Sequence, residues 1–118
     1  MRKILVGMCC LAACGIAAVE SEIQFENDQV RASKVKIMAH EEMELHRYDY
    51  PRVVVSLTGG TMTRLEEDES MTDVDFPKGK AVFRKADPAG QFHRSANRTC
   101  KPIELIIIEL KQSQALAK

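Results

Sequence analysis

The chain has 118 residues, of which 45% are hydrophobic, and this suits one globular domain with a modest core. Its 17 basic and 17 acidic residues balance, so the chain lacks the excess positive charge that attracts nucleic acid. The length leaves no room for a second catalytic domain. Function is therefore expected within a single small fold.

The first residues have the character of a secretory signal. A basic start is followed at 4–13 by a short apolar run that ends in small residues and is too short to span a bilayer permanently. Residues 11–14 resemble a bacterial lipobox, in which cleavage precedes a cysteine that is then lipidated. Cleavage near Ala18 or an uncleaved segment are the alternatives. We predict a signal peptide at 1–13 and lipid on Cys14, which would make the protein an exported, periplasmic, membrane-anchored lipoprotein.

The mature chain is predicted to contain a linker and one domain. Residues 14–28 carry no clear periodicity and indicate a linker, and the domain is expected at 29–118. Cleavage before Cys14 would leave 15 basic against 17 acidic residues, a balance that again argues against a nucleic-acid partner. Cys100 would then be the only free thiol, so an internal disulfide is excluded and stability must come from the core.

Short segments with strand character follow one another along the domain. Residues 29–37 alternate between apolar and charged side chains, which predicts a first strand with one solvated face. The β-branched run at 52–57 is followed by Gly59 and Gly60 and by 61–65, a pattern that predicts a hairpin.

The second half of the domain continues this pattern. An acidic turn at 66–70 precedes short candidate strands at 73–76 and 80–85. The nearly continuous aliphatic run at 103–110 predicts a central strand buried on both faces. Six or more short strands with almost no helical pattern indicate an all-β fold, either a closed barrel or a sandwich of antiparallel strands.

One histidine stands between a tight turn and a short strand at a recognisable spacing. Pro88, Gly90, His93 and Asn97 form the pattern P-x-G-x2-H-x3-N, in which proline and glycine allow a sharp reversal before the imidazole. This pattern resembles the second signature of the cupin family.

A second histidine extends the resemblance to the first cupin signature, G-x5-H-x-H-x3-4-E-x6-G. His46 and a closing Gly59 or Gly60 match it, whereas His40 replaces the opening glycine. Tyr48 stands where the family has its second histidine, and Arg52 or Val53 stands where it has a glutamate. The resemblance covers 30–111 and implies a small antiparallel jelly-roll β-barrel with the motif residues pointing inward.

The resemblance also implies a site for one divalent metal ion, iron, manganese, nickel or zinc, inside the barrel. His46 and His93 are the family ligands that remain, and Tyr48 and Glu44 are the candidates to complete the set. Tyr48 and Glu44 each lie two residues from His46, which would place all three on one strand face. Arg52 would instead oppose a cation and favour an anion through charge-assisted hydrogen bonds.

These residues lead to three functional hypotheses. The leading one is an exported cupin-like domain that binds a small-molecule ligand or a weakly held metal ion and is not an efficient enzyme. The second is a metal-dependent oxygenase or isomerase acting on a small organic acid. The third is a structural lipoprotein that docks with another envelope protein, with a homodimer through sheet edges as one form of it.

Overall fold

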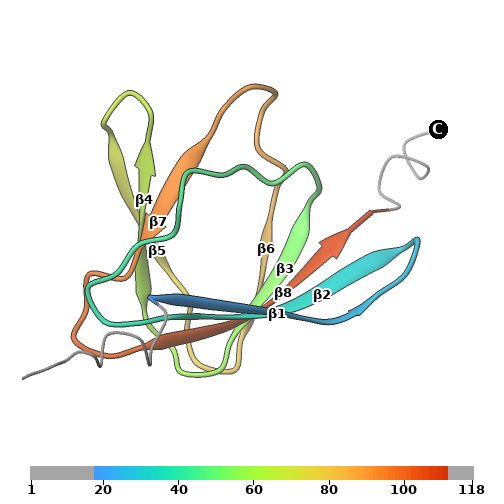
Figure 1. The fold of residues 1–118 in the computed structure, drawn as a ribbon, viewed down its shortest axis with the longest axis horizontal. Helices are drawn as coiled ribbons and strands as arrows, with labels where there is room; N and C mark the ends of the chain where they lie inside the picture. Colours follow the sequence, from blue (N-terminus) through green and yellow to red (C-terminus); the bar gives the residue numbers. More distant parts are fainter. Residues whose placement is uncertain (1–17, 112–118) are drawn as a thin grey trace, which may run out of the picture.

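The computed structural model describes residues 18–111, which form eight β-strands and no helix (Figure 1). Within these residues, no helix is long and apolar enough to cross a membrane. The predicted signal peptide and the lipidation site at Cys14 lie outside the described part of the chain.

The strands form two antiparallel sheets. One has five strands in the order β1-β2-β8-β3-β6, and the other has three in the order β5-β4-β7. The prediction of an all-β, antiparallel fold is confirmed. The strand bounds are β1 Val19–Glu26, β2 Val30–Ile37, β3 Arg52–Ser56, β4 Thr61–Glu66, β5 Met71–Asp75, β6 Ala81–Arg84, β7 His93–Ala96 and β8 Ile103–Leu110.

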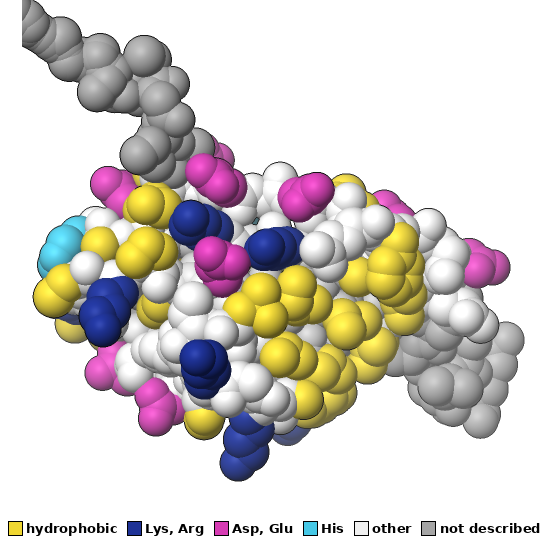
Figure 2. All heavy atoms as spheres, turned by 90° about the horizontal axis from the view of Figure 1, so that it is seen from below, with side chains coloured by type: hydrophobic (Ala, Val, Ile, Leu, Met, Phe, Trp, Pro, Cys, Tyr) yellow, Lys and Arg dark blue, Asp and Glu magenta, His cyan; other side chains and the backbone are white. Residues whose placement is uncertain are grey.

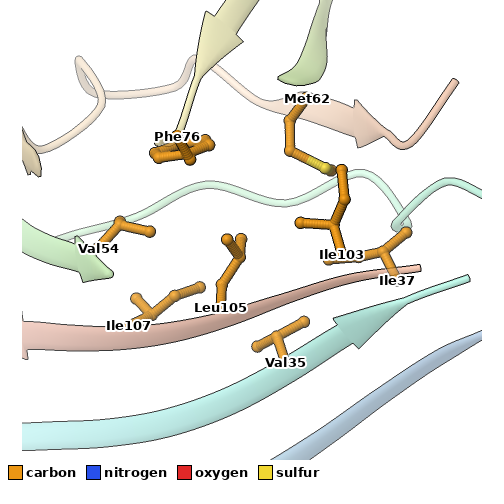
Figure 3. Packing of buried hydrophobic residues seen from close by; sticks show 8 residues of the cluster. All are labelled: Val35, Ile37, Val54, Met62, Phe76, Ile103, Leu105 and Ile107. Carbon is orange, nitrogen blue, oxygen red and sulfur yellow. The ribbon is translucent and has the colours of Figure 1, made fainter. Parts of the chain in front are cut away.

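The core fills part of the space between the two sheets (Figure 3). Alternate residues of β2, β3 and β8 point inward, because successive side chains of a strand face opposite sides. Met62 of β4 and Phe76, which follows β5, complete the cluster from the other sheet. Each fully buried side chain of this kind contributes about 1.5–3 kcal/mol. The cluster consists of Val35, Ile37, Val54, Met62, Phe76, Ile103, Leu105 and Ile107.

The aliphatic strand β8 is central, but it is not buried on both faces as predicted. Ile103, Leu105 and Ile107 are buried, whereas Ile106 and Ile108 are only half-buried. The core covers one face of the five-stranded sheet, and Ile106 and Ile108 lie on the other face.

The prediction of a linker at 14–28 is wrong for residues 19–26. These residues form β1, which pairs with β2 over most of its length. The side chains of β1 are almost all exposed, so backbone hydrogen bonds, and not burial, hold the strand at the sheet edge. The first strand of the domain is therefore β1 and not the segment at 29–37.

The glycine pair after β3 makes a corner between the sheets and not the predicted hairpin. β3 belongs to the five-stranded sheet and β4 to the three-stranded one, so the two strands do not pair. Gly60 has a φ of 131°, and a Cβ there would lie 2.8 Å from Cδ1 of Ile103. Glycine is needed because the chain turns directly against the core.

Candidate functional site

A backbone pairing outside the named strands brings the two motif histidines together. His46 and His93 form an antiparallel bridge in which each N–H donates to the other's carbonyl, at 2.9 and 2.8 Å. Directly opposed residues of such a pair place their side chains on the same face. The two imidazole rings consequently lie 4.4 Å apart between centroids, tilted by 57°.

The position of Glu44 differs from the predicted one. Its side chain is exposed, while the ring of His46 turns inward and its Nδ1 lies 2.6 Å from the backbone carbonyl of Glu44. The chain bends at Leu45, so the alternation of a continuous strand does not hold across 44–46. Tyr48 does reach the interior, with its ring 5.2 Å from that of His46.

Asp87 organises one side of the site, and the sequence analysis did not identify it. Its carboxylate accepts hydrogen bonds from the N–H of Tyr48 at 2.8 Å and from Arg64 Nη2 at 2.9 Å. Burial raises the pKa of this carboxyl, but these two hydrogen bonds, with the nearby His93, hold it below its ordinary value. Asp87 is therefore an anion that is already paired with Arg64.

The buried imidazole of His93 is neutral at physiological pH. Its side chain is 1% exposed, and burial, followed by the charges of His46 and Arg64, lowers its pKa to about 4. Nδ1 of His93 lies 3.4 Å from Oδ2 of Asp87 but makes no hydrogen bond, and Nε2 of His46 is also buried without a partner. Two ring nitrogens are thus left without hydrogen bonds within the described site.

Arg52 is the first residue of β3 and carries a buried positive charge. The residue is 6% exposed, and its guanidinium carbon stacks 3.8 Å from the centroid of the Tyr48 ring. One hydrogen bond is formed, from Nη1 to the carbonyl of Lys85 at 3.1 Å. Burial lowers the pKa of Arg52, yet a guanidinium stays protonated in proteins. Burial raises the pKa of the Tyr48 phenol, because it disfavours the charged form, so the phenol stays protonated.

Tyr48, Arg52 and His93 line a small cavity between the sheets. Its volume is about 50 Å³, which corresponds to a few water molecules. Arginines from β3, β4 and β6 converge on it with Tyr48, His93 and Ser95, while aliphatic, methionine and phenylalanine side chains form the remaining wall. The polar lining residues are Tyr48, Arg52, Arg64, Arg84, His93 and Ser95.

The residues of this cavity do not fit a divalent metal ion. Within residues 18–111, no three histidine, cysteine, aspartate or glutamate side chains are grouped as a metal site requires. Of the predicted set, His46, His93 and Tyr48 lie together and Glu44 does not join them. The phenol of Tyr48 is held protonated, and a neighbouring guanidinium repels a cation.

Arg64, Arg84 and Asp87 are the site residues that sequence reasoning missed. Asp87 directly precedes the Pro88 turn of the recognised motif, and this adjacency was the available signal. Arg64 and Arg84 stand in ordinary alternating strands. Strand pairing within one sheet sets Arg84 beside Arg52, and the packing of the two sheets brings Arg64 to the same cavity.

No protein-family model matches this sequence, and neither does any curated protein. Among solved structures, the chain is similar to a cupin domain from Bordetella pertussis, with a TM-score of 0.70, 20% identity and coverage of 80% of this chain and 94% of that one. A cupin superfamily protein from Desulfitobacterium hafniense is similar with a TM-score of 0.58 and 18% identity, over 85% of this chain and 86% of that one. An RmlC-like cupin from Shewanella frigidimarina has a TM-score of 0.56 and 13% identity, over 84% of this chain and 81% of that one. The chain therefore has the cupin fold, and the predicted jelly-roll β-barrel is confirmed.

Proposed function

We propose that this domain binds a small organic anion, a carboxylate, inside the barrel and acts as a binding domain and not as an efficient enzyme. One observation carries the proposal. The buried guanidinium of Arg52 faces the cavity with one hydrogen bond and no ion pair to any carboxylate within residues 18–111. A buried charge without a partner is costly, so a ligand of opposite sign is expected to complete it.

The pairing of charges on the inner face supports this reading. Arg31, Glu109, Arg52 and Arg84 follow one another in register across β2, β8, β3 and β6. Arg31 donates to both carboxylate oxygens of Glu109, at 3.1 and 3.3 Å, and Asp87 is paired with Arg64. Arg52 and Arg84 are then like charges directly opposite each other, an arrangement that is unfavourable unless an anion lies between them.

The other cavity residues limit the chemistry of the ligand. Tyr48, held protonated, offers a hydroxyl donor, and the neutral His93 adds polarity without a further positive charge. A carboxylate suits an arginine because the planar guanidinium can donate two parallel hydrogen bonds. The rest of the lining is apolar, and the cavity is small. The expected ligand is a short carboxylic acid with a hydrocarbon remainder.

The test is calorimetric titration of the full chain with a panel of short monocarboxylates and with inorganic phosphate. Arg52→Met should abolish carboxylate binding, because the guanidinium is its main partner. Arg94→Met is the matched control, since Arg94 is exposed on β7 and, within the described part of the chain, forms an ion pair with Glu42 alone, at 3.5 Å. Binding that survives Arg52→Met, or an absence of binding to every member of the panel, would contradict the proposal.

We also propose that the domain is exported and anchored by lipid on Cys14. Support comes from the lipobox-like sequence at 11–14 alone. The intact mass of the membrane-extracted protein should show acyl chains, and Cys14→Ser should lose them and remain in the soluble periplasmic fraction. An unmodified mass for the natural sequence would reject the anchor.

A further inference from the structure

Strand β6 ends the five-stranded sheet with backbone groups that pair with no other strand within residues 18–111. The carbonyl of Pro51, just before β3, accepts a hydrogen bond from the N–H of Leu110 in β8. Odd-numbered residues of β3 therefore point their backbone groups toward β8, and even-numbered ones toward the even-numbered residues of β6. The N–H and C=O groups of Ala81 and Phe83 consequently point away from the sheet. These groups form the β6 edge.

The three other sheet edges of the described chain are each protected against a further strand. The register of β1 shifts between Ile23 and Phe25, and such an irregularity interrupts the row of backbone groups that a new strand needs. Two bridges from the segment before β3 cover β7. β5 carries Asp73 and Asp75 within the strand, and charged side chains there discourage strand addition. β6 keeps a continuous register over its whole length.

Exposed apolar and basic side chains surround the β6 edge. Ala81 is exposed, and Phe83 is 60% exposed although it is aromatic. Lys78 and Lys80 precede the strand and Lys85 follows it, and all three are exposed without an ion pair in the described part of the chain. Figure 2 shows basic side chains beside hydrophobic ones at the lower border of the molecule. The lysines flank the strand, so they leave its backbone accessible.

We propose that the β6 edge binds an extended acidic segment of another protein, which adds to the five-stranded sheet as a sixth strand. The segment exchanges backbone hydrogen bonds with Ala81 and Phe83, which supply affinity, and its side chains supply specificity. Acidic residues near its two ends meet Lys80 and Lys85. An apolar residue opposite Phe83 covers that ring on the outer face of the sheet, the side away from the core.

The positions of the lysines set the length of this segment. Five steps of about 3.4 Å separate Lys80 from Lys85, roughly 17 Å along an extended chain. About seven residues of the partner therefore suffice to place a carboxylate at each lysine, with an apolar centre between them.

The ends of this chain do not supply the acidic segment. Residues 1–17 and 112–118, which lie outside the described part of the chain, contain no aspartate or glutamate. The acidic run at 67–69 already forms the turn between β4 and β5. The segment is therefore assigned to a partner protein.

Fluorescence anisotropy of the full chain with the labelled peptide EEVTVEE tests strand addition. This peptide has acidic ends and an apolar centre, and it reads the same in both directions, so it suits either strand orientation. The matched probe is EEVPVEE, which keeps the four charges but has a central proline that lacks an N–H and fits an added strand poorly. We expect saturable binding of EEVTVEE and about ten-fold weaker binding of EEVPVEE. Equal affinities, or no binding of EEVTVEE up to about 500 μM, would overturn the proposal.

A substitution in the backbone of the β6 edge tests its location. Ala81→Pro removes the outward N–H of the first residue of β6, a position where a sheet edge tolerates proline. It should weaken EEVTVEE binding about ten-fold. Ala81→Thr is the matched control, because it keeps the N–H, and it should leave binding unchanged. Circular dichroism checks that each variant is folded. Unchanged binding by folded Ala81→Pro would place the peptide elsewhere and reject the β6 edge.

Charge reversal is an independent test that leaves the backbone intact. Lys80→Glu and Lys85→Glu should each weaken EEVTVEE binding about three-fold, and the double variant should prefer the basic peptide KKVTVKK. Arg98→Glu is the matched control, since Arg98 is exposed but follows β7 in the other sheet. A double variant that still prefers the acidic peptide contradicts the proposal. Self-association of the wild type that is lost on Ala81→Pro would assign the edge to a second copy, and the proposal would fail.

Discussion

Replacement of Arg52 by methionine separates a ligand-binding role from a structural one. Arg52→Met keeps the length of the side chain and removes the guanidinium. Without ligand, it removes a charged hydrogen bond to the carbonyl of Lys85, about 1.5–3 kcal/mol, and the stacking on Tyr48, about 1–2 kcal/mol. It also removes an unpaired buried charge, whose desolvation costs several kcal/mol. We expect these contributions to cancel to within about 1 kcal/mol of unfolding free energy.

Arg64→Met is the contrasting change. Arg64 donates to Oδ1 of Asp87 at 2.9 Å, and its loss leaves that buried carboxylate without its cationic partner. Breaking a buried pair by removing one member costs about 3–5 kcal/mol. The two substitutions remove the same chemical group from the same cavity, so a difference of about 2–4 kcal/mol between them reports which arginine is already paired.

Urea unfolding followed by circular dichroism, on ligand-free protein at pH 7.5, measures both free energies. A loss for Arg52→Met as large as that for Arg64→Met would show that Arg52 is satisfied by the protein itself. The argument for an anion in the barrel would then fail. Repetition with a saturating carboxylate should stabilise the wild type by RT ln(1 + [L]/Kd), about 2.7 kcal/mol at a hundred-fold excess over Kd, and should leave Arg52→Met unchanged.

Three further outcomes are expected. Because the pKa of His93 in the folded chain is about 4, below its ordinary 6.5, the unfolded state takes up the proton first as the pH falls. The free energy of unfolding should decline between about pH 6.5 and 4, by roughly 3 kcal/mol at most, and unfolding of His93→Gln across that range should show a flatter profile. Gly60→Ala should destabilise the domain by about 2–4 kcal/mol because its Cβ would meet Ile103 at 2.8 Å, whereas Gly90→Ala, with open space at its Cβ, should cost only the backbone strain of about 1–2 kcal/mol, as thermal melts can show. Elemental mass spectrometry of protein purified without chelator should find far less than one metal ion per chain. About one ion per chain that is lost on His46→Ala/His93→Ala would restore the metal hypothesis.

Sequence patterns predicted the parts of the fold that bury side chains or turn sharply. The alternation before 37 and the β-branched run after Arg52 correspond to β2 and β3, because burial on one face leaves a period of two. β1 escaped prediction, since it is held by backbone hydrogen bonds at an exposed edge and buries almost nothing. Gly59 and Gly60 predicted a hairpin, but they form a corner between the sheets; glycine provides the positive φ that either turn requires.

The site was accessible to sequence reasoning only where its residues share a motif. The spacing around His93 and His46 pointed to one pocket, and a backbone bridge does bring the two rings together. Arg64 and Asp87 could not be placed, because their contacts depend on how the two sheets pack. The prediction that Glu44 shares a face with His46 was wrong because the chain bends at Leu45, and strand alternation does not hold across a bend.

The cavity is lined by one face of β3 and β6, and the next residues along each strand lie on the other face. Arg52 and Arg84 point into the cavity, while their immediate neighbours Val53 and Phe83 belong to the outer face. A shift of β6 by one residue would move Arg84 outward and Phe83 inward, because the side-chain period of a strand is two. The ligand site therefore depends on this register, and an insertion of a single residue in β6 should abolish ligand binding.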